Sequence, residues 1–448
     1  MSNPGEADLT PITAVRDLAG WFAAGSKPRD AWRVGTEHEK IGFRRRDLSP
    51  PPYEGPDGIG AILEGLAARG WERIEDSGNL IGLKRGLASV SLEPGGQFEL
   101  SGAPVATIGE TEAELASHLS ELHAVAEPLG VSFTALGFHP IATREAMPWM
   151  PKSRYAIMRD YMPRVGDMGL DMMLRTSTVQ ANLDFGEEAD MVEKLRISLA
   201  LQPLATALFA NSPFREGQVS GYRTLRGHVW SRTDPDRTGI PEVVFEDGFG
   251  FERFSEFVLD VPMYFVMREG RFVDATNATF RQFMADGLPG RPDIRATMGD
   301  WADHVTTVFT DVRLKRFLEM RGADVGSPAM IAALPALWVG LLYDDAAQKA
   351  ARALTKDWTV AQIRATRAEV PTIALDATVA GLPLREVARD VLAIARGGLK
   401  ARGGGEERFL EPLERIVASG ETAADHWLRR NAEAWGGDVS QVFGEAEL

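Results

Sequence analysis

Residues 34–40 read Val-Gly-Thr-Glu-His-Glu-Lys and lie within a strand predicted over 32–43. Successive side chains of a strand point to opposite faces, so Glu37 and Glu39 share one face. Two carboxylates on one rigid strand suit Mg²⁺, which takes oxygen ligands and keeps several waters. Taken alone, the stretch favours a simpler interpretation, in which both glutamates belong to a solvated strand face.

A second segment with the same spacing spans residues 92–100 and reads Leu-Glu-Pro-Gly-Gly-Gln-Phe-Glu-Leu. Gln97 and Glu99 share a strand face here, and the glycines beside the acids indicate backbone that approaches a ligand closely. The alternative is a turn followed by an amphipathic strand. That alternative is favoured for the segment alone, although Pro-Gly-Gly is unusual inside a continuous strand region.

Two further segments, residues 178–184 and 317–321, repeat the spacing. In the first, Gln180 and Asn182 alternate with apolar residues, which equally describes an edge strand with one wet face. In the second, the planar guanidinium of Arg321 suits phosphate or carboxylate, and the alternative is an exposed, salt-bridged strand. If all four segments join one sheet, the buried carboxylates on the shared face need partners, and divalent metal ions carrying phosphate are the simplest.

The composition is that of a soluble globular protein, with 44% hydrophobic and 25% charged residues. From the 448 residues we expect a catalytic core over 1–326 and a helical region over 327–448 packed on it. The net charge of −15 repels nucleic acid and anionic membrane, so neither is an expected partner. The chain has no cysteine, no secretory signal and no long apolar run, which favours a cytoplasmic location.

Periodicity predicts several helices and strands along the chain. Helical patterns lie at 11–24, 57–68, 110–129, 152–162 and 189–209, and a hairpin region at 71–102. Short strands mixed with helices, without a strict βαβ alternation, predict an α+β fold with an antiparallel sheet.

The motifs that are missing narrow the chemistry. The chain contains no G-x-x-x-x-G-K-[ST], so ATP, if used, is not held by a P-loop, and neither H-E-x-x-H nor G-x-S-x-G occurs. Arginines gather between residues 152 and 237 of this acidic chain, which predicts a pocket for an anionic small molecule. For most of them individually the alternative, scattered solubilising charge, is the better interpretation. They are Arg154, Arg159, Arg164, Arg175, Arg223, Arg226, Arg232 and Arg237.

Many long segments, in matching order, resemble glutamate–cysteine ligase of the plant and proteobacterial type. They are GTEHEK at 35–40, SLEPGGQFELSGAP at 91–104, MPKSRYAIMRDYMP at 150–163, GLDMMLRTSTVQANLDF at 169–185 and LALQPLATALFANSPF at 199–214. Agreement continues through DRTGIP at 236–241, DVPMYFV at 260–266, TFRQFM at 279–284 and FLEMRGAD at 317–324. The resemblance covers nearly the whole chain, apart from its start and much of the final helical region.

The resemblance implies an ATP-dependent ligase that joins the γ-carboxylate of glutamate to the amine of cysteine through a γ-glutamyl phosphate. This reaction is the first step of glutathione synthesis. The implied fold is similar to the catalytic domain of glutamine synthetase, in which a curved antiparallel sheet forms a funnel with helices outside. Two or three Mg²⁺ ions lie on the funnel wall. The positions that match the metal-binding residues of the family are Glu37, Glu39, Glu93, Gln97, Glu99 and Glu319.

The chemistry of phosphoryl transfer to a carboxylate suggests further roles. Mg²⁺ neutralises the triphosphate of ATP, and Glu39 helps to hold it. Arg321 is expected to stabilise charge on the transferring phosphoryl group, with Gln180 and Asn182 beside the nucleotide. The residues expected to hold the two amino-acid substrates are Arg154, Tyr155, Arg175, Trp230 and Arg237.

The chain departs from the plant members in one respect. Plant members carry cysteine pairs that form redox-regulating disulfides and govern dimerisation, whereas this chain has no cysteine. That switch cannot operate here, and we expect a monomer. Two alternative functions stay open: a γ-glutamyl ligase that uses another amine, and a non-catalytic relative that binds nucleotide or glutamate.

Overall fold

The computed structural model describes residues 8–448 and is built around one eight-stranded sheet. Every neighbouring pair of strands in this sheet is antiparallel, which confirms the predicted antiparallel sheet with its accompanying helices. In spatial order the strands are β15 (Val312–Leu314), β16 (Leu318–Asp324), β8 (Thr178–Leu183), β1 (Val34–His38), β6 (Phe98–Ser101), β5 (Ala88–Leu92), β4 (Asn79–Arg85) and β3 (Glu72–Asp76).

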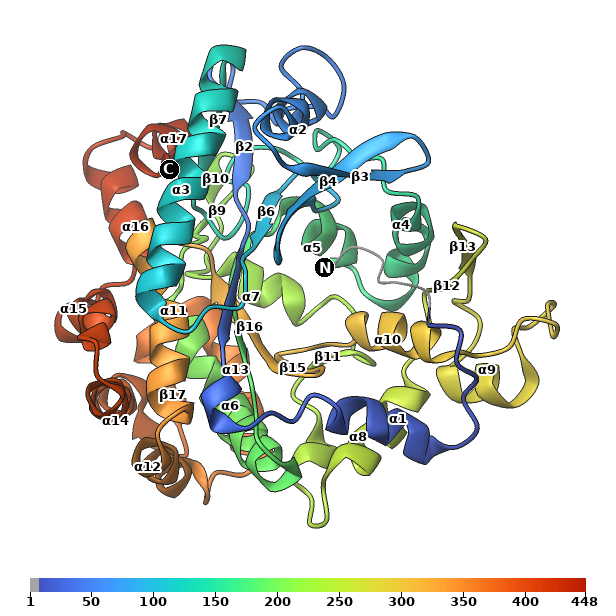
Figure 1. Cartoon of the computed structure of the whole chain (residues 1–448). Coiled ribbons are helices and arrows are strands. Elements are labelled where there is room, and N and C mark those ends of the chain that lie inside the picture. The colour runs from blue at the N-terminus through green and yellow to red at the C-terminus, as the bar shows by residue number, and fades with distance from the viewer. Residues whose placement is uncertain (1–7) are drawn as a thin grey trace.

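One face of the sheet is apolar and packs against helices (Figure 1). Val179, Ala181 and Leu183 of β8 alternate with polar residues, and all three side chains are buried in the core. Removing apolar surface from water stabilises this packing by roughly 25 cal/mol per Å². The covering helices are α2 (Ile59–Ala67), α3 (Ile108–Ala126), α6 (Glu188–Leu208) and α11 (Pro328–Leu342).

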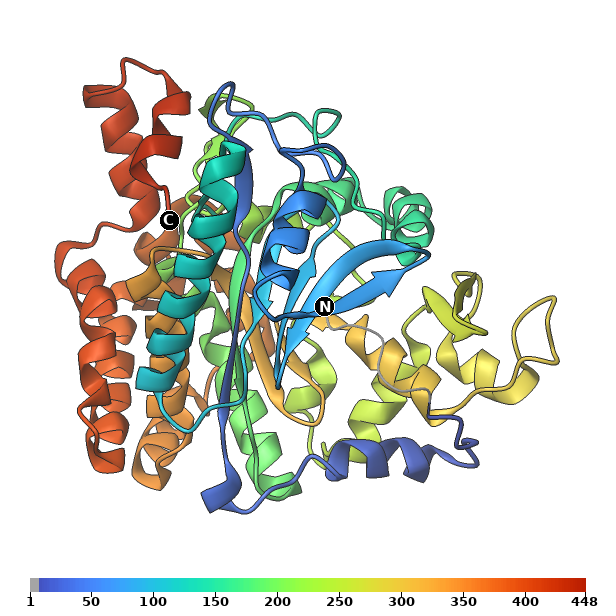
Figure 2. The ribbon, with the colours of Figure 1, turned by 45° about the horizontal axis from the view of Figure 1, so that its top comes forward.

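The C-terminal helices extend this helical layer away from the sheet (Figure 2). One hydrophobic core contains side chains from both expected parts of the chain, such as Leu204 of α6 and Leu337 of α11, so the parts share their packing. These helices are α12 (Asp345–Thr355), α13 (Val360–Ile373), α14 (Leu384–Arg402), α15 (Glu411–Ser419), α16 (Ala423–Glu433) and α17 (Val442–Glu445).

The other helices and the small strand pairs complete the molecule, and several of them face the polar side of the sheet (Figures 1 and 2). The helices are α1 (Val15–Ala23), α4 (Arg154–Val165), α5 (Gly169–Arg175), α7 (Leu225–Trp230), α8 (Phe251–Asp260), α9 (Phe280–Asp286) and α10 (Met298–Thr306). The strand pairs are β2 (Ile41–Arg44) with β7 (Val131–Thr134), β9 (Phe214–Arg215) with β10 (Gln218–Val219), β11 (Thr238–Gly239) with β14 (Phe309–Thr310), β12 (Phe265–Arg268) with β13 (Arg271–Asp274), and β17 (Thr378–Val379) with β18 (Leu382–Pro383).

The five predicted helices are confirmed as α1, α2, α3, α4 and α6, with ends displaced by a few residues. The single strand predicted over 32–43 is wrong, because the chain changes partners there. The Lys40 N–H still donates to the Phe98 carbonyl at 3.1 Å, but from Ile41 onward the backbone pairs with β7. Among residues 8–448, no single helix is both long and apolar enough to cross a membrane.

Candidate active site

The strand register places the predicted polar residues on one face of the sheet. Glu37 in β1 lies opposite Gln180 in β8, and Glu319 in β16 lies opposite Asn182. Asn182 also lies opposite Gly35, where a Cβ atom would approach the Asn182 Cβ to 3.3 Å. The glycine therefore leaves room beside Asn182, whose Nδ2 donates to Glu37 Oε1 at 2.8 Å.

Three further carboxylates, those of Glu39, Glu93 and Glu99, gather next to this row. Glu39 follows β1, and its Oε2 accepts from the Thr178 N–H at 3.0 Å; Ser101 Oγ donates to Glu99 Oε1 at 2.8 Å. Burial, together with the charges of Glu93 and Glu99, raises the pKa of Glu39 well above its usual value. A cation placed among these carboxylates would relieve that repulsion.

This donor set fits Mg²⁺, because carboxylate oxygens are the ligands that Mg²⁺ prefers and water completes its coordination. Within residues 8–448, no three His, Asp or Glu side chains already surround a common point at metal-binding geometry. Binding an ion therefore requires glutamate side chains to rotate toward it, and the attraction of the cation would offset their mutual repulsion.

A cationic cluster adjoins the carboxylates at the β15–β16 edge and surrounds Glu319. Glu319 Oε2 contacts Arg313 Nη2 at 2.6 Å and Arg321 Nη1 at 2.7 Å, while Oε1 contacts Lys315 Nζ at 2.9 Å. Burial opposes ionisation of this carboxyl, but the three cations hold its pKa well below the usual range. Arg321 Nη1 also donates to Gln180 Oε1 at 2.6 Å, which fixes the direction of the guanidinium.

A cavity with about 560 Å³ of empty space lies over the acidic and cationic groups. Its polar wall comes from the sheet, and its other walls come from α4, α5, α7 and the end of β14. Arg226 of α7 is buried at its edge and lies close enough to Glu39 for their charges to interact. The lining residues are Glu39, Glu93, Pro94, Gln97, Met158, Met172, Met173, Thr176, Thr178, Gln180, Arg226, Trp230, Phe309 and Arg321.

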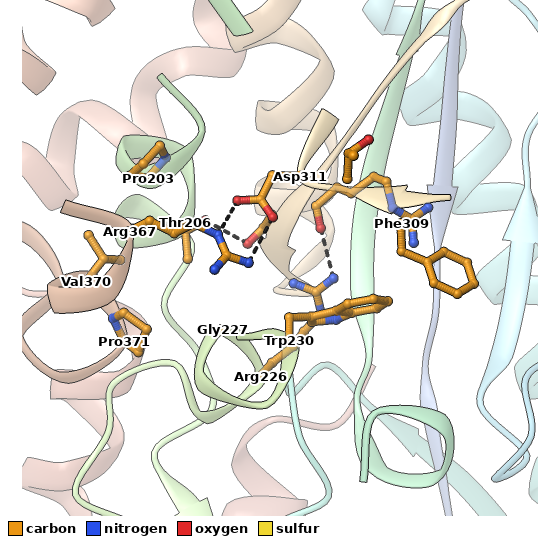
Figure 3. A pocket seen from close by; sticks show the side chains of 13 residues that line it. Pro203, Thr206, Arg226, Gly227, Trp230, Phe309, Asp311, Arg367, Val370 and Pro371 are labelled. Atoms are coloured by element: carbon orange, nitrogen blue, oxygen red, sulfur yellow. Dashed lines mark hydrogen bonds and ion pairs between the residues drawn. The ribbon is translucent and has the colours of Figure 1, made fainter. Parts of the chain in front are cut away.

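A second cavity of about 470 Å³ lies behind Arg226, Trp230, Phe309 and Arg321, which line both spaces (Figure 3). Here Arg226 Nη2 donates to the Arg321 carbonyl at 2.8 Å. The sheet register shifts between Met320 and Ala323, so Arg321 lies in a β-bulge and its backbone finds partners outside the β8 ladder. Bulges next to active sites commonly redirect a side chain.

The bulge is also supported from the C-terminal region. The Arg321 N–H donates to the Asp311 carbonyl at 3.1 Å. Arg367 of α13 binds the Asp311 carboxylate with two hydrogen bonds, Nε to Oδ2 at 2.5 Å and Nη2 to Oδ1 at 3.0 Å (Figure 3). Helix α13, from the C-terminal region of the chain, thus helps to place Arg321.

The sequence profile of glutamate-cysteine ligase family 2 matches residues 33–445, which include every residue described in this site. The chain belongs to that family. It is 50% identical over 436 residues to a chloroplastic glutamate–cysteine ligase of Brassica juncea, covering 97% of this chain and 84% of the relative. The corresponding enzyme of Arabidopsis thaliana is 51% identical over 97% of this chain and 83% of its own length.

A solved structure of glutamate–cysteine ligase from Francisella tularensis in complex with AMP has a similar fold. Its TM-score is 0.57 at 12% sequence identity, and the match covers 93% of this chain and 87% of that one. Family membership confirms the predicted enzyme, an ATP-dependent glutamate–cysteine ligase of glutathione synthesis. The expected cytoplasmic location is contradicted, because the similar plant enzymes are named chloroplastic.

In this glutamate–cysteine ligase family member, the side-chain amide of Gln97 forms hydrogen bonds with backbone groups. Its Oε1 accepts from the Gly95 N–H at 2.9 Å, and its Nε2 donates to the carbonyls of Thr176 at 2.8 Å and Met173 at 3.3 Å. Gln97 therefore joins the Pro-Gly-Gly turn to the end of α5, besides lining the cavity.

Two of the arginines expected to hold substrate are committed elsewhere. Arg175 is ion-paired with Asp171 and contacts Glu216 at 2.9 Å, and Arg237 contacts Asp234 at 2.7 Å. Both guanidinium groups are fully buried and neither residue lines the two cavities. Each guanidinium belongs to a buried ion pair that supports α5 or the segment before β11, and the substrate-binding role of Arg175 and Arg237 stays a prediction.

The other expected substrate residues lie nearer the cavity. Trp230 lines both cavities, and Tyr155 donates its hydroxyl hydrogen to the Leu92 carbonyl at 2.7 Å. Arg154 is buried at the start of α4, close enough to Glu93 for their charges to interact.

Several residues of the site had no distinguishing signal in the sequence. Arg226 is one of several arginines in the basic segment, and Phe309 lies between Val308 and Thr310 in a stretch without a recognisable motif. Asp311 and Arg367 become recognisable only in the folded chain, where Arg367 of α13 pairs with Asp311 between β14 and β15. Met158, Met172 and Met173 also line the cavity, and their side chains carry no charge that would single them out.

Proposed function

We propose that the polar face of the sheet binds Mg-ATP and glutamate and that cysteine enters the cavity beside it. One observation carries this proposal: a group of carboxylates lies directly beside a group of cations on one rigid surface. Mg-ATP requires ligands for its metal and positive charge for its phosphates, and these two groups supply both.

Glu37, Glu39, Glu93 and Glu99 would hold two or three Mg²⁺ ions, with Gln97 fixing the turn between the last two. Bound there, Mg²⁺ neutralises the triphosphate and polarises its phosphoryl oxygens. Glu319 would contribute Oε1, whose contact among the described residues is Lys315 Nζ. Its Oε2 would remain with Arg313 and Arg321.

The side chains of the cationic cluster would handle the charge that moves in the reaction. Arg321, directed by Gln180 and Glu319, would contact the transferring phosphoryl group, and Asn182 would hold Glu37 in place. Transfer of the γ-phosphoryl group from ATP would release ADP and make the glutamate side chain an acyl phosphate. Attack of the cysteine amine on its carbonyl would then expel inorganic phosphate and, with loss of a proton from the nitrogen, leave the amide. Trp230 and Phe309 would exclude water, which would otherwise hydrolyse that intermediate.

The sheet and its outer helices would form the funnel found in the glutamine synthetase catalytic domain, and the enzyme would act as a monomer. Both points remain proposals. Two alternatives to the function are a γ-glutamyl ligase with another amine acceptor and a binding protein without catalysis. ADP release measured with glutamate, Mg-ATP and a panel of amines tests them together. Cysteine should give the highest kcat/KM. If another amine gave a higher value, that amine would replace cysteine as the assigned acceptor. If no amine led to ADP release, catalysis would be refuted.

A further inference from the structure

A cleft with about 670 Å³ of empty space lies outside the cavity that holds the acidic residues. It separates the turn of the β3–β4 hairpin from the β12–β13 hairpin, and both views show these two hairpins near the start of α4 (Figures 1 and 2). Two cations reach it from the segment before and at the start of α4. The lining residues are Glu75, Asp76, Ser77, Ile81, Lys152, Arg154, Met267, Gly270 and Phe272.

The buried ammonium of Lys152 lines this cleft, with the charges of Glu93, Glu99 and Asp76 nearby. The residue is 4% exposed, and its Nζ finds no hydrogen-bond acceptor among residues 8–448. A buried ammonium without an acceptor is costly, so such a group indicates a ligand that supplies one. The Nζ atom lies 5.7 Å from the centre of the Tyr155 ring, which offers only a weak cation–π contact.

The acids of the cleft are already engaged by other groups. Asp76 accepts from the Ser153 N–H at 2.7 Å and from Ser153 Oγ at 2.8 and 3.0 Å, and Glu75 contacts Arg73 at 3.1 Å. The bonds to Ser153 also fix the segment that carries Lys152. Among residues 8–448, the group of the cleft that still lacks a hydrogen-bond partner is therefore the Lys152 ammonium.

The cleft is connected to the acidic wall through the start of α4. Lys152 and Arg154 both interact electrostatically with Glu93, and the Tyr155 hydroxyl anchors the helix to the Leu92 carbonyl at 2.7 Å. A phosphate held by Lys152 would therefore lie near Glu93, one of the carboxylates proposed to hold Mg²⁺. On its other side the cleft is apolar, with the side chains of Ile81, Met267 and Phe272.

We propose that this cleft binds the adenine nucleotide, with the base against Phe272 and Met267 and a phosphate oxygen accepting a hydrogen bond from Lys152 Nζ. An aromatic base joined to a chain of phosphates matches an apolar wall followed by a cation and then a metal-binding wall. This inference rests on the proposed function, because it states where the ATP of that reaction binds. Lys152 is then a substrate-binding residue for ATP, while glutamate and cysteine occupy the inner cavity.

The test compares Lys152→Met with Lys152→Arg and with the control Lys84→Met, an exposed lysine of the same hairpin region. Steady-state kinetics give KM for ATP, glutamate and cysteine, and equilibrium binding of AMP without Mg²⁺ or amino acids gives nucleotide affinity alone. Loss of one charged hydrogen bond should raise the KM for ATP and the AMP dissociation constant about 10-fold or more. The Arg variant should recover most of this loss, the control should match wild type, and the other two KM values should change less than about 3-fold.

Phe272→Ala adds a second, independent readout. It should weaken AMP binding while leaving inhibition by inorganic triphosphate unchanged, because it removes contact with the base only. An unchanged AMP affinity in Lys152→Met would overturn the proposal. A rise in the KM for glutamate or cysteine alone would overturn it as well, because the cleft would then hold an amino-acid carboxylate. Failure of the proposed function looks different: the wild-type enzyme would form no ADP although it binds AMP normally.

Discussion

Replacing Glu39 by glutamine should separate catalysis from stability. The amide keeps the size of the side chain and an oxygen that can accept from the Thr178 N–H, which now lies 3.0 Å from Oε2. The substitution removes the carboxylate of Glu39. The pKa of this group is raised well above its usual value by burial and by the charges of two neighbouring glutamates. The substitution therefore removes a charge proposed to hold Mg²⁺ and, at the same time, a source of repulsion in the metal-free protein.

The two effects have opposite signs. Turnover should fall at least about 10²-fold, equivalent to about 2.7 kcal/mol, as for other preorganised charge contacts. The free energy of unfolding without metal should rise, by about 1.4 kcal/mol for each unit by which folding raises the pKa of Glu39. Because the folded state binds the proton more tightly than the unfolded chain, the wild type loses stability as the pH rises above the ordinary glutamate value of about 4.5. The variant lacks this loss.

Urea unfolding in EDTA between pH 4 and pH 8 would measure the difference, alongside ADP release at saturating Mg²⁺. The stability curves of wild type and Glu39→Gln should meet at the acid end and diverge as the pH rises. Glu72→Gln, which changes an exposed glutamate of β3, serves as the control and should alter neither quantity. Near wild-type turnover in Glu39→Gln would refute the metal-binding role. A variant that is less stable than wild type at pH 8 would refute the repulsion.

Substitutions at three further positions distinguish catalytic, positioning and structural arginines. Arg321→Ala should lower kcat by about 10²-fold or more with little change in melting temperature; a large loss of stability with full activity of the folded fraction would make Arg321 structural. Arg367→Gln should lower kcat about 10-fold without raising any KM, because the pair with Asp311 places Arg321 indirectly. Arg367→Lys should restore part of the rate. Equal kcat in wild type and both variants would contradict this role. Arg175→Met should cost about 3 kcal/mol in urea unfolding, because it leaves the buried Asp171 short of a partner, and a raised substrate KM without that loss would instead return Arg175 to the substrate site.

Much of the polar face could be predicted from the sequence because strand periodicity is local. Residues two apart in a strand share a face whatever lies around them, so Gln180 and Asn182 were assigned to one surface before their partners were known. The register then confirms that Glu37 and Glu319 share this surface, each opposite one of those amides. The antiparallel sheet was predictable for the same reason, from short strands and their turn residues.

The arginines were not predictable in the same way. Whether an arginine reaches a substrate depends on which acid lies beside it after folding, and that acid is often distant in sequence. Arg175 and Arg237 form buried ion pairs with acids within four residues of them in the sequence, whereas Arg226 lines the cavity. The strand over 32–43 failed for a related reason, since the change of partner after Lys40 depends on where β7 lies.

The central claim is that glutamates from separate strands hold the metal ions of Mg-ATP on the polar face of the sheet. The most direct measurement is a crystal structure with Mn²⁺ and a non-hydrolysable ATP analogue, in which anomalous scattering locates the ions. We expect anomalous peaks bonded to the carboxylates of Glu39, Glu93 and Glu99, at about 2.0–2.2 Å, with the triphosphate between them and Arg321. Ions bound to the phosphates but to none of these glutamates would contradict the account.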